Sequence, residues 1–597
     1  MATQQRPVLP SVGNPVKRQR ILAIALLVLL VVFAGRLVLV QGVNASELSQ
    51  EALAQRLVTS SVDTERADIV DRNGVVLATS VKRYNVGVNQ TLVADFKRIE
   101  NGTVVAEGAL DAAKILAPIL DLKESELAAD MVGDSTWKYI AKDITPETWG
   151  LISAEKITGI EPEPTSERLY PNGDIGGNIV GFTAASADSS VVKGAAGAEL
   201  EYEDELLGKP GSITYEKGGG GTIIPTGEFE ETPAVPGSTV VLTIDRDIQW
   251  QVQKIVADAV KKTGTERAMV VVEKVKTGEI LALVDSDSVD PSDPGATDVT
   301  ARGSRAVSTV FEPGSTGKVV TMAAALEEGI ATPTSEYLAP YKYTTANDQT
   351  FKDSHDVGTQ KLTLAGILVD SSNTGTVQVG QQLSKETRYD YLTAFGFGAP
   401  TDVGLPNESG GILHPWEDWD GRTQYAVLFG QGVSVTALQT AQVYQTIANG
   451  GVRLQPTIVK GLQHDDGTFT DRELDNPKRV VSEKTASELM LMLEDVTEEG
   501  TGGLAQIDGY RVAGKTGTAQ AADEDGQLTK IVASFVGMAP ADDPEIVVSV
   551  IMYEPKTSIW GGTVAAPVFK DVAAFTLQAL RVPPSGEPAD LYPTHWE

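Results

Sequence analysis

The longest hydrophobic stretch of the chain lies near its beginning. Residues 21–35 read ILAIALLVLLVVFAG, and the apolar character resumes after Arg36. A helix needs about 20 largely apolar residues to cross a bilayer, so 21–43 is long enough if the Arg36 side chain reaches toward the outer interface. A cleaved signal peptide is the alternative, but the stretch is longer than an h-region and no clean A-x-A cleavage site follows it. We therefore predict an uncleaved transmembrane helix over residues 21–43.

The charges beside this stretch predict its orientation. Residues 1–46 carry five basic residues and no acidic one, and three of the five, Lys17, Arg18 and Arg20, directly precede the apolar segment. Loops rich in Lys and Arg stay in the cytoplasm. We expect a cytoplasmic tail over 1–20, a single crossing of the plasma membrane, and an extracytoplasmic location for the remainder of the chain.

The next part of the chain, residues 44–237, mixes short strand and helix patterns. Residues 66–80 read as strand, turn and strand, with Asn73-Gly74 as the hairpin signal. The tripeptide Val235-Pro236-Gly237 then marks a boundary. We interpret 44–237 as a mixed α+β domain.

The pattern from residue 238 to 580 predicts a larger domain built on a sheet. Apolar residues in 246–263 recur on one helix face, and runs typical of strands follow in pairs joined by turns. The predicted strands are 240–244, 268–273, 279–284, 531–538 and 545–552, and a second helix is predicted over 567–580. Such hairpins flanked by helices favour an α/β or α+β fold with a central antiparallel sheet. The proline-rich residues 581–597 are expected to form a loose tail.

Composition limits the chemistry that these domains can carry. The 597 residues include 81 acidic and 49 basic side chains, for a net charge of −32, with no cysteine and four histidines. Without cysteine there is no disulfide, iron–sulfur cluster, thiolate zinc site or cysteine nucleophile. No H-E-x-x-H zinc motif is present either. The acidic chain lacks the basic surface of a nucleic-acid binder, so we expect no nucleic-acid partner.

A candidate nucleophile and base lie in the segment FEPGSTGK, residues 311–318. Pro and Gly precede an Ala-rich apolar stretch, which puts Ser315 at the N-terminus of a predicted helix. Residues three apart share a helix face, so Ser315 and Lys318 can touch. A lysine whose pKa is lowered by burial can take the serine proton, and the helix N-terminus offers N–H groups to an oxyanion. By itself S-x-x-K is weak, because a serine N-cap followed by a surface lysine gives the same pattern.

Two further patterns follow along the chain. Ser371-Ser372-Asn373 comes after a helical stretch and can place two polar side chains in a cleft. Lys515-Thr516-Gly517-Thr518 offers a positive charge and hydroxyls to a carboxylate, while its glycine lets a ligand backbone approach a strand edge. Each pattern alone is common, but the ordered set S-x-x-K, S-x-N, K-T-G is specific.

This set resembles the penicillin-binding serine D,D-transpeptidases, and further motifs place the resemblance in class B. The resemblance covers nearly the whole chain, and S-S-N is the form of the middle motif that class B members share. The other matching motifs are Arg66 with Asp71-Arg72-Asn73-Gly74, Arg168-Leu169-Tyr170-Pro171, Leu242-Thr243-Ile244-Asp245, Gly430-Gln431-Gly432 with Gln439, Asn449-Gly450-Gly451, Ala513-Gly514, and Gly561-Gly562 with Ala566-Pro567-Val568-Phe569. On this resemblance 44–237 is a non-catalytic pedestal or dimerisation-type domain, and 238–580 is the penicillin-binding transpeptidase domain.

The resemblance implies acyl transfer from a peptidoglycan stem peptide, and β-lactams as ligands of the same site. Ser315, deprotonated by Lys318, would attack the penultimate carbonyl of D-Ala-D-Ala, with the backbone N–H groups of Ser315 and Thr518 holding the oxyanion. An amine from a neighbouring stem would then resolve the acyl-enzyme and form the crosslink. No metal or organic cofactor is needed for this chemistry.

The same resemblance assigns roles to the remaining motif residues. Ser371 and Lys515 would help to pass a proton to the leaving D-Ala, and Asn373 would position the donor. The terminal carboxylate would lie against Thr516, Gly517 and Thr518, with the two threonine hydroxyls as hydrogen-bond donors.

Other enzyme classes fit the sequence less well. Residues 509–516 match the P-loop pattern G-x-x-x-x-G-K-[ST], but residues 517–526, directly after them, show no amphipathic helix pattern, and the segment is expected outside the cytoplasm. A Ser-His-Asp hydrolase lacks support because there is no G-x-S-x-G elbow and no histidine near Ser315. No histidine precedes residue 355, which argues against the glycosyltransferase domain of bifunctional relatives. The length and the anchor argue against a β-lactamase.

Within the family we expect the cell-division type, acting at the division septum with a membrane glycan polymerase and division proteins as partners. An elongation-type transpeptidase is the alternative. A function of a different class is also open: a scaffold that chiefly recruits the polymerase through the span and pedestal, with catalysis secondary.

Overall fold

The computed structural model describes residues 14–62, 64–185, 192–217, 224, 226–522 and 526–597. Most of the tail predicted over 1–20 therefore lies outside the described residues. The chain divides into two compact units. Residues up to Thr64 and Lys209–Val235 form the first unit, and Glu65–Gly208 with Pro236–Glu597 form the second. The predicted boundary at 237 lies beside Pro236, where the chain re-enters the second unit.

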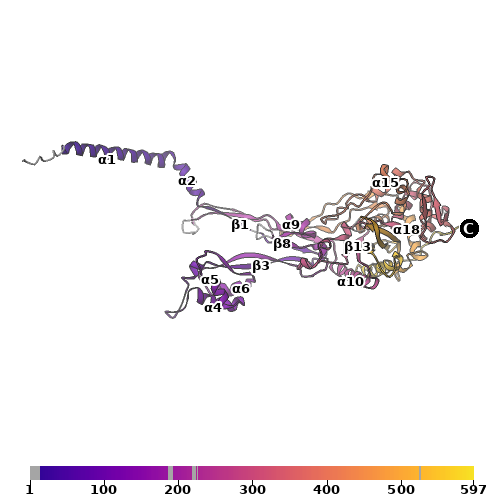
Figure 1. Cartoon of the computed structure of the whole chain (residues 1–597), viewed down its shortest axis with the longest axis horizontal. Helices are drawn as coiled ribbons and strands as arrows, with labels where there is room; N and C mark the ends of the chain where they lie inside the picture. Colours follow the sequence, from indigo (N-terminus) through magenta and orange to yellow (C-terminus); the bar gives the residue numbers. More distant parts are fainter. Residues whose placement is uncertain (1–13, 63, 186–191, 218–223, 225, 523–525) are drawn as a thin grey trace, which may run out of the picture. The chain divides into compact units, whose positions relative to one another are not determined.

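The first unit begins with a long apolar helix (Figure 1). Helix α1 spans Pro15–Val38, and a π-helical turn over Leu39–Val43 extends it to 29 residues, long and apolar enough to cross a membrane. The helix starts earlier than residue 21 because Asn14 accepts a hydrogen bond from the Val16 amide and Pro15 suits the first helical position. The three basic residues before the apolar stretch thus belong to the helix.

The rest of the first unit is a short helix and a three-stranded antiparallel sheet. Helix α2 is Ala45–Ala54. The strands follow the order β1 (Leu57–Val62), β10 (Gly211–Glu216) and β11 (Phe229–Thr232). This sheet brings a segment from beyond residue 208 back beside the strand that follows α2.

Residues 65–208 of the second unit form a region with its own hairpin and helical end. The hairpin predicted at Asn73-Gly74 is present as β2 (Ile69–Val70) and β3 (Val76–Val88). Around the C-terminal end of β3 a separate hydrophobic core forms. Its surroundings are α4 (Gly108–Leu120), α5 (Glu124–Met131), β6 (Lys138–Ile144), α6 (Pro146–Ala154) and β7 (Ile160–Leu169). Figure 1 shows α4, α5 and α6 gathered beside this end of β3. This agrees with a mixed α+β pedestal.

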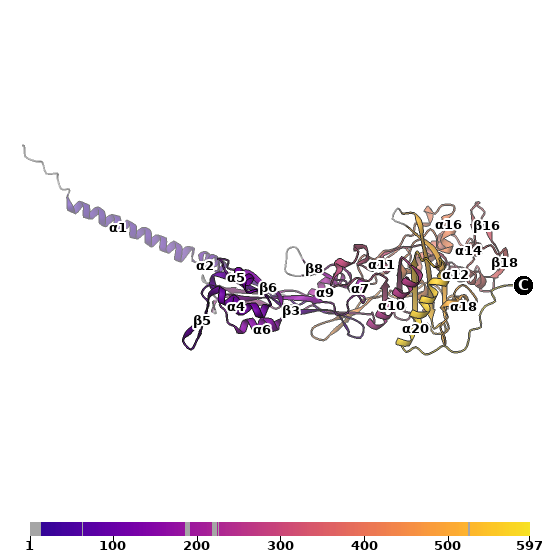
Figure 2. The same cartoon turned by 60° about the horizontal axis from the view of Figure 1, so that its bottom comes forward.

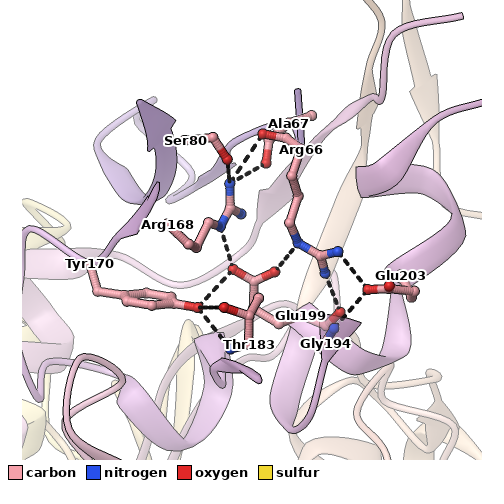
Figure 3. Close-up of polar contacts among 9 residues, drawn as sticks. All are labelled: Arg66, Ala67, Ser80, Arg168, Tyr170, Thr183, Gly194, Glu199 and Glu203. Atoms are coloured by element: carbon pink, nitrogen blue, oxygen red, sulfur yellow. Dashed lines mark hydrogen bonds and ion pairs between the residues drawn. The ribbon is translucent and has the colours of Figure 1, made fainter. Parts of the chain in front are cut away.

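A buried ion network joins three distant segments of this region (Figure 3). Glu199 is fully buried, and its two carboxylate oxygens accept hydrogen bonds from Arg66 Nε at 2.6 Å and Arg168 Nε at 2.7 Å. Arg66 also pairs with Glu203, and the Tyr170 hydroxyl lies 3.3 Å from Glu199. Burial, and then the charge of Glu199, raises the pKa of Tyr170 to about 12. Removing one partner from a buried pair costs about 3–5 kcal/mol, so the network locks these segments into one arrangement.

The central sheet of the second unit is antiparallel, as predicted. Four of its strands match the predicted ranges to within a few residues, and the fifth carries the K-T-G pattern at a sheet edge. The order is β14 (Ile280–Asp285), β13 (Arg267–Lys274), β25 (Ile546–Tyr553), β24 (Leu528–Ala539) and β23 (Ala513–Ala522). The remaining predicted strand is β12 (Thr239–Leu242), which pairs with β2 and so continues into the pedestal region.

Helices cover both faces of this sheet (Figure 2). The two predicted helices, α10 (Arg246–Thr263) and α20 (Ala566–Ala579), lie side by side on one face. Helices α17 (Ala437–Ala448) and α18 (Glu483–Glu498) pack on the other. Side chains alternate between faces along a strand, so β13 contributes to both of the large cores. The α+β fold with a helix-flanked antiparallel sheet is therefore confirmed.

The residues after 580 form no helix or strand of their own, but the prediction of a loose tail is wrong for them. The Val582 carbonyl accepts a hydrogen bond from the Tyr510 hydroxyl at 2.7 Å, and Ser585 Oγ donates to Asp542 at 2.7 Å. Near the end, the Thr594 carbonyl accepts from the Thr363 amide at 3.0 Å. Proline prevents regular structure but leaves carbonyls and side chains free to bond, so a segment without regular structure can still be fixed in place.

Candidate active site

The predicted nucleophile lies in a tight turn that leads into helix α12. Residues Gly314–Gly317 form a 3₁₀ turn, and α12 (Lys318–Glu327) begins directly after it, so Ser315 precedes the regular helix instead of starting it. Gly314 has a φ of +55°, and a Cβ there would lie 2.8 Å from the Ala519 side chain on β23. Only glycine fits this approach. Ser315 is half-buried, whereas the residues on both sides of it are buried.

Lys318 is fully buried at the start of α12. Its Nζ donates hydrogen bonds to the Ser371 carbonyl and, at 3.2 Å, to the Ser371 hydroxyl. Burial lowers the pKa of Lys318 to about 7, while the nearby charge of Asp353 acts in the opposite direction. The amine is therefore about half neutral near pH 7, which a general base requires. Among the described residues no hydrogen bond joins Lys318 to Ser315, so the S-x-x-K spacing brings the lysine to Ser371 instead.

Ser371 occupies the turn between two helices. Helix α13 (Leu364–Val369) ends just before it, and α14 (Asn373–Gly380) begins just after it. Ser371 has a φ of +58°, a left-handed conformation that costs a non-glycine residue about 1–3 kcal/mol. The hydrogen bond from Lys318 to its carbonyl helps to hold this conformation, so the first and second motifs stabilise each other.

Asp353 fixes the S-S-N turn from outside it, and no sequence pattern indicated this role. It follows β17 (Thr350–Lys352), and one carboxylate oxygen accepts from the amides of Asn373 at 2.6 Å and Thr374 at 2.9 Å. The other oxygen accepts from the Ser372 hydroxyl at 2.8 Å. Asp353 thus caps the N-terminus of α14 although it lies 20 residues before Asn373 in the sequence. Sequence patterns indicate only those caps that lie next to their helix.

The third motif lies on the edge strand β23. Lys515 is fully buried, and its Nζ donates to the Thr516 hydroxyl at 3.3 Å. Burial, and then the positive charge of Lys318, holds the pKa of Lys515 well below its usual range, although Asp370 opposes this shift. A Cβ at position 517 would lie 2.3 Å from Ser534 Oγ, so glycine is required there. The Thr518 hydroxyl donates to the Ile559 carbonyl at 3.3 Å.

These elements surround one cleft of about 590 Å³. Six of the eight predicted site residues line it, and the other two, Lys318 and Lys515, are fully buried. The lining residues of the predicted site are Ser315, Ser371, Asn373, Thr516, Gly517 and Thr518. Two aromatic side chains that the sequence did not indicate, His355 and Trp560, also line the cleft, with ring centroids 5.2 Å apart.

The cleft combines the groups that acyl transfer needs. It contains serine hydroxyls, a half-neutral lysine bonded to one of them, and a second buried lysine beside a row of threonines. Lys515 lies inside strand β23, which continues to Ala522 and is followed by another strand, β24, so no helix begins at the lysine and the geometry of a P-loop is not present. Within the described residues no cluster of three His, Asp or Glu side chains could hold a metal ion.

Comparison with known proteins agrees with this chemistry. The penicillin-binding protein transpeptidase domain matches residues 268–574, and the penicillin-binding protein dimerisation domain matches residues 61–242. Penicillin-binding protein PbpB of Mycolicibacterium smegmatis is 35% identical, covering 96% of this chain and 91% of that protein. Peptidoglycan D,D-transpeptidase FtsI of Escherichia coli K12 is 30% identical, covering 94% and 91%. Penicillin-binding protein 3 of Mycobacterium tuberculosis, solved in complex with aztreonam, superimposes with a TM-score of 0.68 at 30% identity, covering 90% of this chain and all of that one.

The chain therefore belongs to the penicillin-binding protein transpeptidase family. Within the family its relatives place it among the class B proteins, which join a dimerisation domain to the transpeptidase domain. It is a peptidoglycan D,D-transpeptidase.

Proposed function

We propose that this enzyme crosslinks peptidoglycan stem peptides through an acyl-enzyme on Ser315. Lys318 removes the Ser315 proton as the oxygen attacks the penultimate carbonyl of a D-Ala-D-Ala stem. The observation that carries the proposal is the fully buried Lys318, whose pKa of about 7 leaves a neutral amine next to the cleft at physiological pH. A serine hydroxyl becomes a strong nucleophile only when such a base takes its proton.

The position of Ser371 supports a proton path to the leaving group. Its hydroxyl lies 3.2 Å from Lys318 Nζ, so the proton taken from Ser315 can pass through Ser371 to the departing D-Ala amine. Lys515, also buried, assists this transfer. Asn373 begins α14 at the rim of the same cleft and positions the donor stem.

The edge strand β23 is the proposed site of the substrate carboxylate. Thr516 and Thr518 present hydroxyl donors there, Gly517 gives the peptide backbone room, and Lys515 supplies positive charge. The backbone N–H groups of Ser315 and Thr518 stabilise the oxyanion of the tetrahedral intermediate. An amine of a second stem then attacks the ester carbonyl, which forms the crosslink and releases Ser315.

We further propose that the apolar helix over Pro15–Val43 anchors the enzyme in the plasma membrane with the N-terminus in the cytoplasm, and that it acts at the division septum. The orientation is supported by the basic residues before the apolar stretch. The septal role, with a glycan polymerase and division proteins as partners, is supported by the resemblance to the cell-division type of class B proteins. An elongation role is the alternative.

A cell-based test separates the enzyme from a scaffold. All the motif residues of the reaction lie beyond residue 238, whereas recruitment of a polymerase needs only the span and the pedestal. We expect Ser315→Ala, fused to a fluorescent protein, to localise at the septum like the parent chain but to fail to support growth as the only copy. Replacing the span by an unrelated one should do the reverse, keeping β-lactam binding and losing the partner.

Two outcomes would contradict the proposal. Normal growth and division with Ser315→Ala as the only copy would show that the scaffold is the correct function. Uniform localisation of the parent chain along the side wall would favour the elongation role.

A further inference from the structure

The last residues of the chain return to the catalytic region at the element that leads to Ser371. Residues 593–596, here called the C-terminal strap, run antiparallel to β18 (Thr359–Thr363). His595 forms a backbone bridge with Leu362, and the Trp596 amide donates to the Lys361 carbonyl at 3.3 Å. The other edge of β18 pairs with β15 (Glu336–Pro340), so the strap adds a third extended segment to a two-stranded sheet. An isolated two-stranded sheet is only marginally stable.

Side chains fasten the strap at both of its ends. The Thr363 hydroxyl donates to the Pro593 carbonyl at 2.6 Å and accepts from the Gly366 amide at 3.0 Å, so one hydroxyl both caps helix α13 and holds the strap. At the other end, Trp596 Nε1 donates to the Tyr337 carbonyl on β15 at 3.2 Å. The strap thus spans both strands of the small sheet.

Gly366 shows that helix α13 is adapted to this contact. Glycine inside a helix costs about 1 kcal/mol relative to alanine, and Gly366 is the third residue of a helix only six residues long. A Cβ at this position would lie 1.8 Å from the Thr594 carbonyl oxygen, and the three nearest heavy atoms all belong to Thr594. The strap is therefore the reason that this position requires glycine.

We propose that the C-terminal strap is a positioning element for Ser371. Helix α13 is short, and short helices depend on external contacts for stability. It ends two residues before Ser371, whose strained turn holds the hydroxyl at Lys318. The strap fixes the first turn of α13 through Thr363 and Gly366, and His595 Nε2 lies 4.0 Å from the carboxylate of Asp370, the neighbour of Ser371. This inference rests on the proposed part of Ser371 in acylation.

The direct test shortens the full chain after Tyr592 and measures acylation by a reporter β-lactam. We expect the first-order acylation constant to fall by about 10-fold or more, because misplacing a catalytic group by about 1 Å can cost 10²-fold, while the non-covalent binding constant stays the same. A synthetic peptide with the sequence of residues 589–597 should restore the rate, and the same peptide carrying Trp596→Ala should not. A control chain that lacks only Glu597 should react like the parent. An unchanged acylation constant in the shortened chain, or a loss that the peptide does not restore, would overturn the proposal.

A second variant tests the same contact without a deletion. Gly366→Ala in the full chain should displace Thr594 and reproduce the loss, but in the shortened chain it should cause no further loss, because nothing then occupies the space. Equal losses of acylation rate in the full and the shortened chain would mean that Gly366→Ala does not act through the strap.

Amide hydrogen exchange separates a failure of the strap from a failure of the acyl-enzyme mechanism. Residues 364–372 should exchange faster in the shortened chain than in the full chain, whatever the chemistry at Ser315. A full chain that no β-lactam acylates would refute the mechanism alone, and unchanged exchange in this segment would refute the strap.

Discussion

At the scale of single residues, the chemistry depends on two lysine side chains that the fold keeps out of water. Lys318 and Lys515 are both fully buried, and each has a lowered pKa chiefly because of that burial. Burial lowers the pKa of Lys318 to about 7 and so leaves its neutral form accessible at physiological pH, while its Nζ donates hydrogen bonds to Ser371. Arginine at the same place would keep its charge at any relevant pH.

The first prediction concerns Lys318 as the base. Wild-type acylation by a β-lactam should rise with pH through about 7, because the neutral amine increases above that pKa. Lys318→Arg should lower the acylation rate by at least about 10²-fold, the lower range for loss of a general base, and should abolish this pH step. Stopped-flow acylation of the folded variant measures both. Lys484→Arg on the surface of α18 is the matched control. Near-wild-type acylation of Lys318→Arg would mean that a group other than Lys318 removes the Ser315 proton.

The second prediction concerns Asp353, which caps α14 and holds the S-S-N turn. Asp353→Ala should lower the acylation rate by about 10-fold or more through misplacement of Ser371 and Asn373. The stability cost should be about 1–2 kcal/mol, as for loss of a helix cap. Asp356→Ala, three residues away on the same loop, is the control, since among the described residues that carboxylate bonds only to the Gly358 amide. If both variants acylate like the parent, Asp353 does not position the turn.

At the scale of elements, the central sheet carries an unusual side chain in its core. Glu273 on β13 is fully buried, and among the described residues neither of its carboxyl oxygens has a hydrogen-bond partner. Burial raises its pKa to about 8, so the carboxyl group is neutral in the folded protein at pH 7. The sheet therefore tolerates an acid only in its protonated form.

The third prediction follows from that pKa. Between about 4.5 and 8 the folded state keeps the Glu273 proton that the unfolded chain releases, so the free energy of unfolding falls as pH rises. Glu273→Gln removes this pH dependence of the free energy of unfolding. The difference in that free energy, variant minus parent, should therefore increase by at least about 1 kcal/mol from pH 5 to pH 8. Calorimetric melting over a pH series measures this difference, with Glu161→Gln at an exposed position of β7 as the control. A constant difference across the series would mean that Glu273 is not protonated in the folded state.

Elements and motifs with local signals were predictable from the sequence, whereas contacts across the chain were not. Helix α10 matches its predicted range because its apolar residues repeat at the helical period, and the three catalytic motifs are contiguous. Three contacts that hold the fold join residues far apart in the sequence. Glu199 bonds to Arg66 across 133 positions, and Asp353 bonds to Asn373 across 20. In the C-terminal strap, Thr594 bonds to Thr363 across 231 positions. Such pairings depend on the tertiary fold, and no local sequence pattern predicts them. The loose tail was the wrong expectation for this reason.

At the scale of the whole molecule, the chain separates its proposed tasks. The long apolar helix lies at one end of the sequence, the dimerisation domain match covers residues 61–242, and the transpeptidase match covers 268–574. Basic residues precede the apolar stretch and acidic residues prevail after it. This asymmetry predicts one crossing of the membrane, with the catalytic region outside.

The fourth prediction is this topology. Protease added to intact spheroplasts should destroy an epitope placed after Glu597 and spare one placed before Met1, because only the N-terminal end lies in the cytoplasm. Lysed spheroplasts, in which both epitopes are digested, serve as the control. Protection of the C-terminal epitope in intact spheroplasts would reverse the orientation.

The central claim is that Ser315 is the acylated nucleophile, and peptide mass spectrometry tests it most directly. When Ser315 Oγ attacks a β-lactam carbonyl, the ring C–N bond breaks and the drug remains as an ester on the serine. Trypsin should release this ester on the peptide of residues 306–318, and fragmentation should place the added mass on Ser315. Ser308→Ala, a change in the same peptide outside the cleft, should leave labelling intact, and Ser315→Ala should abolish it. An adduct on Ser371 or any other residue, or undiminished labelling of Ser315→Ala, would contradict the account.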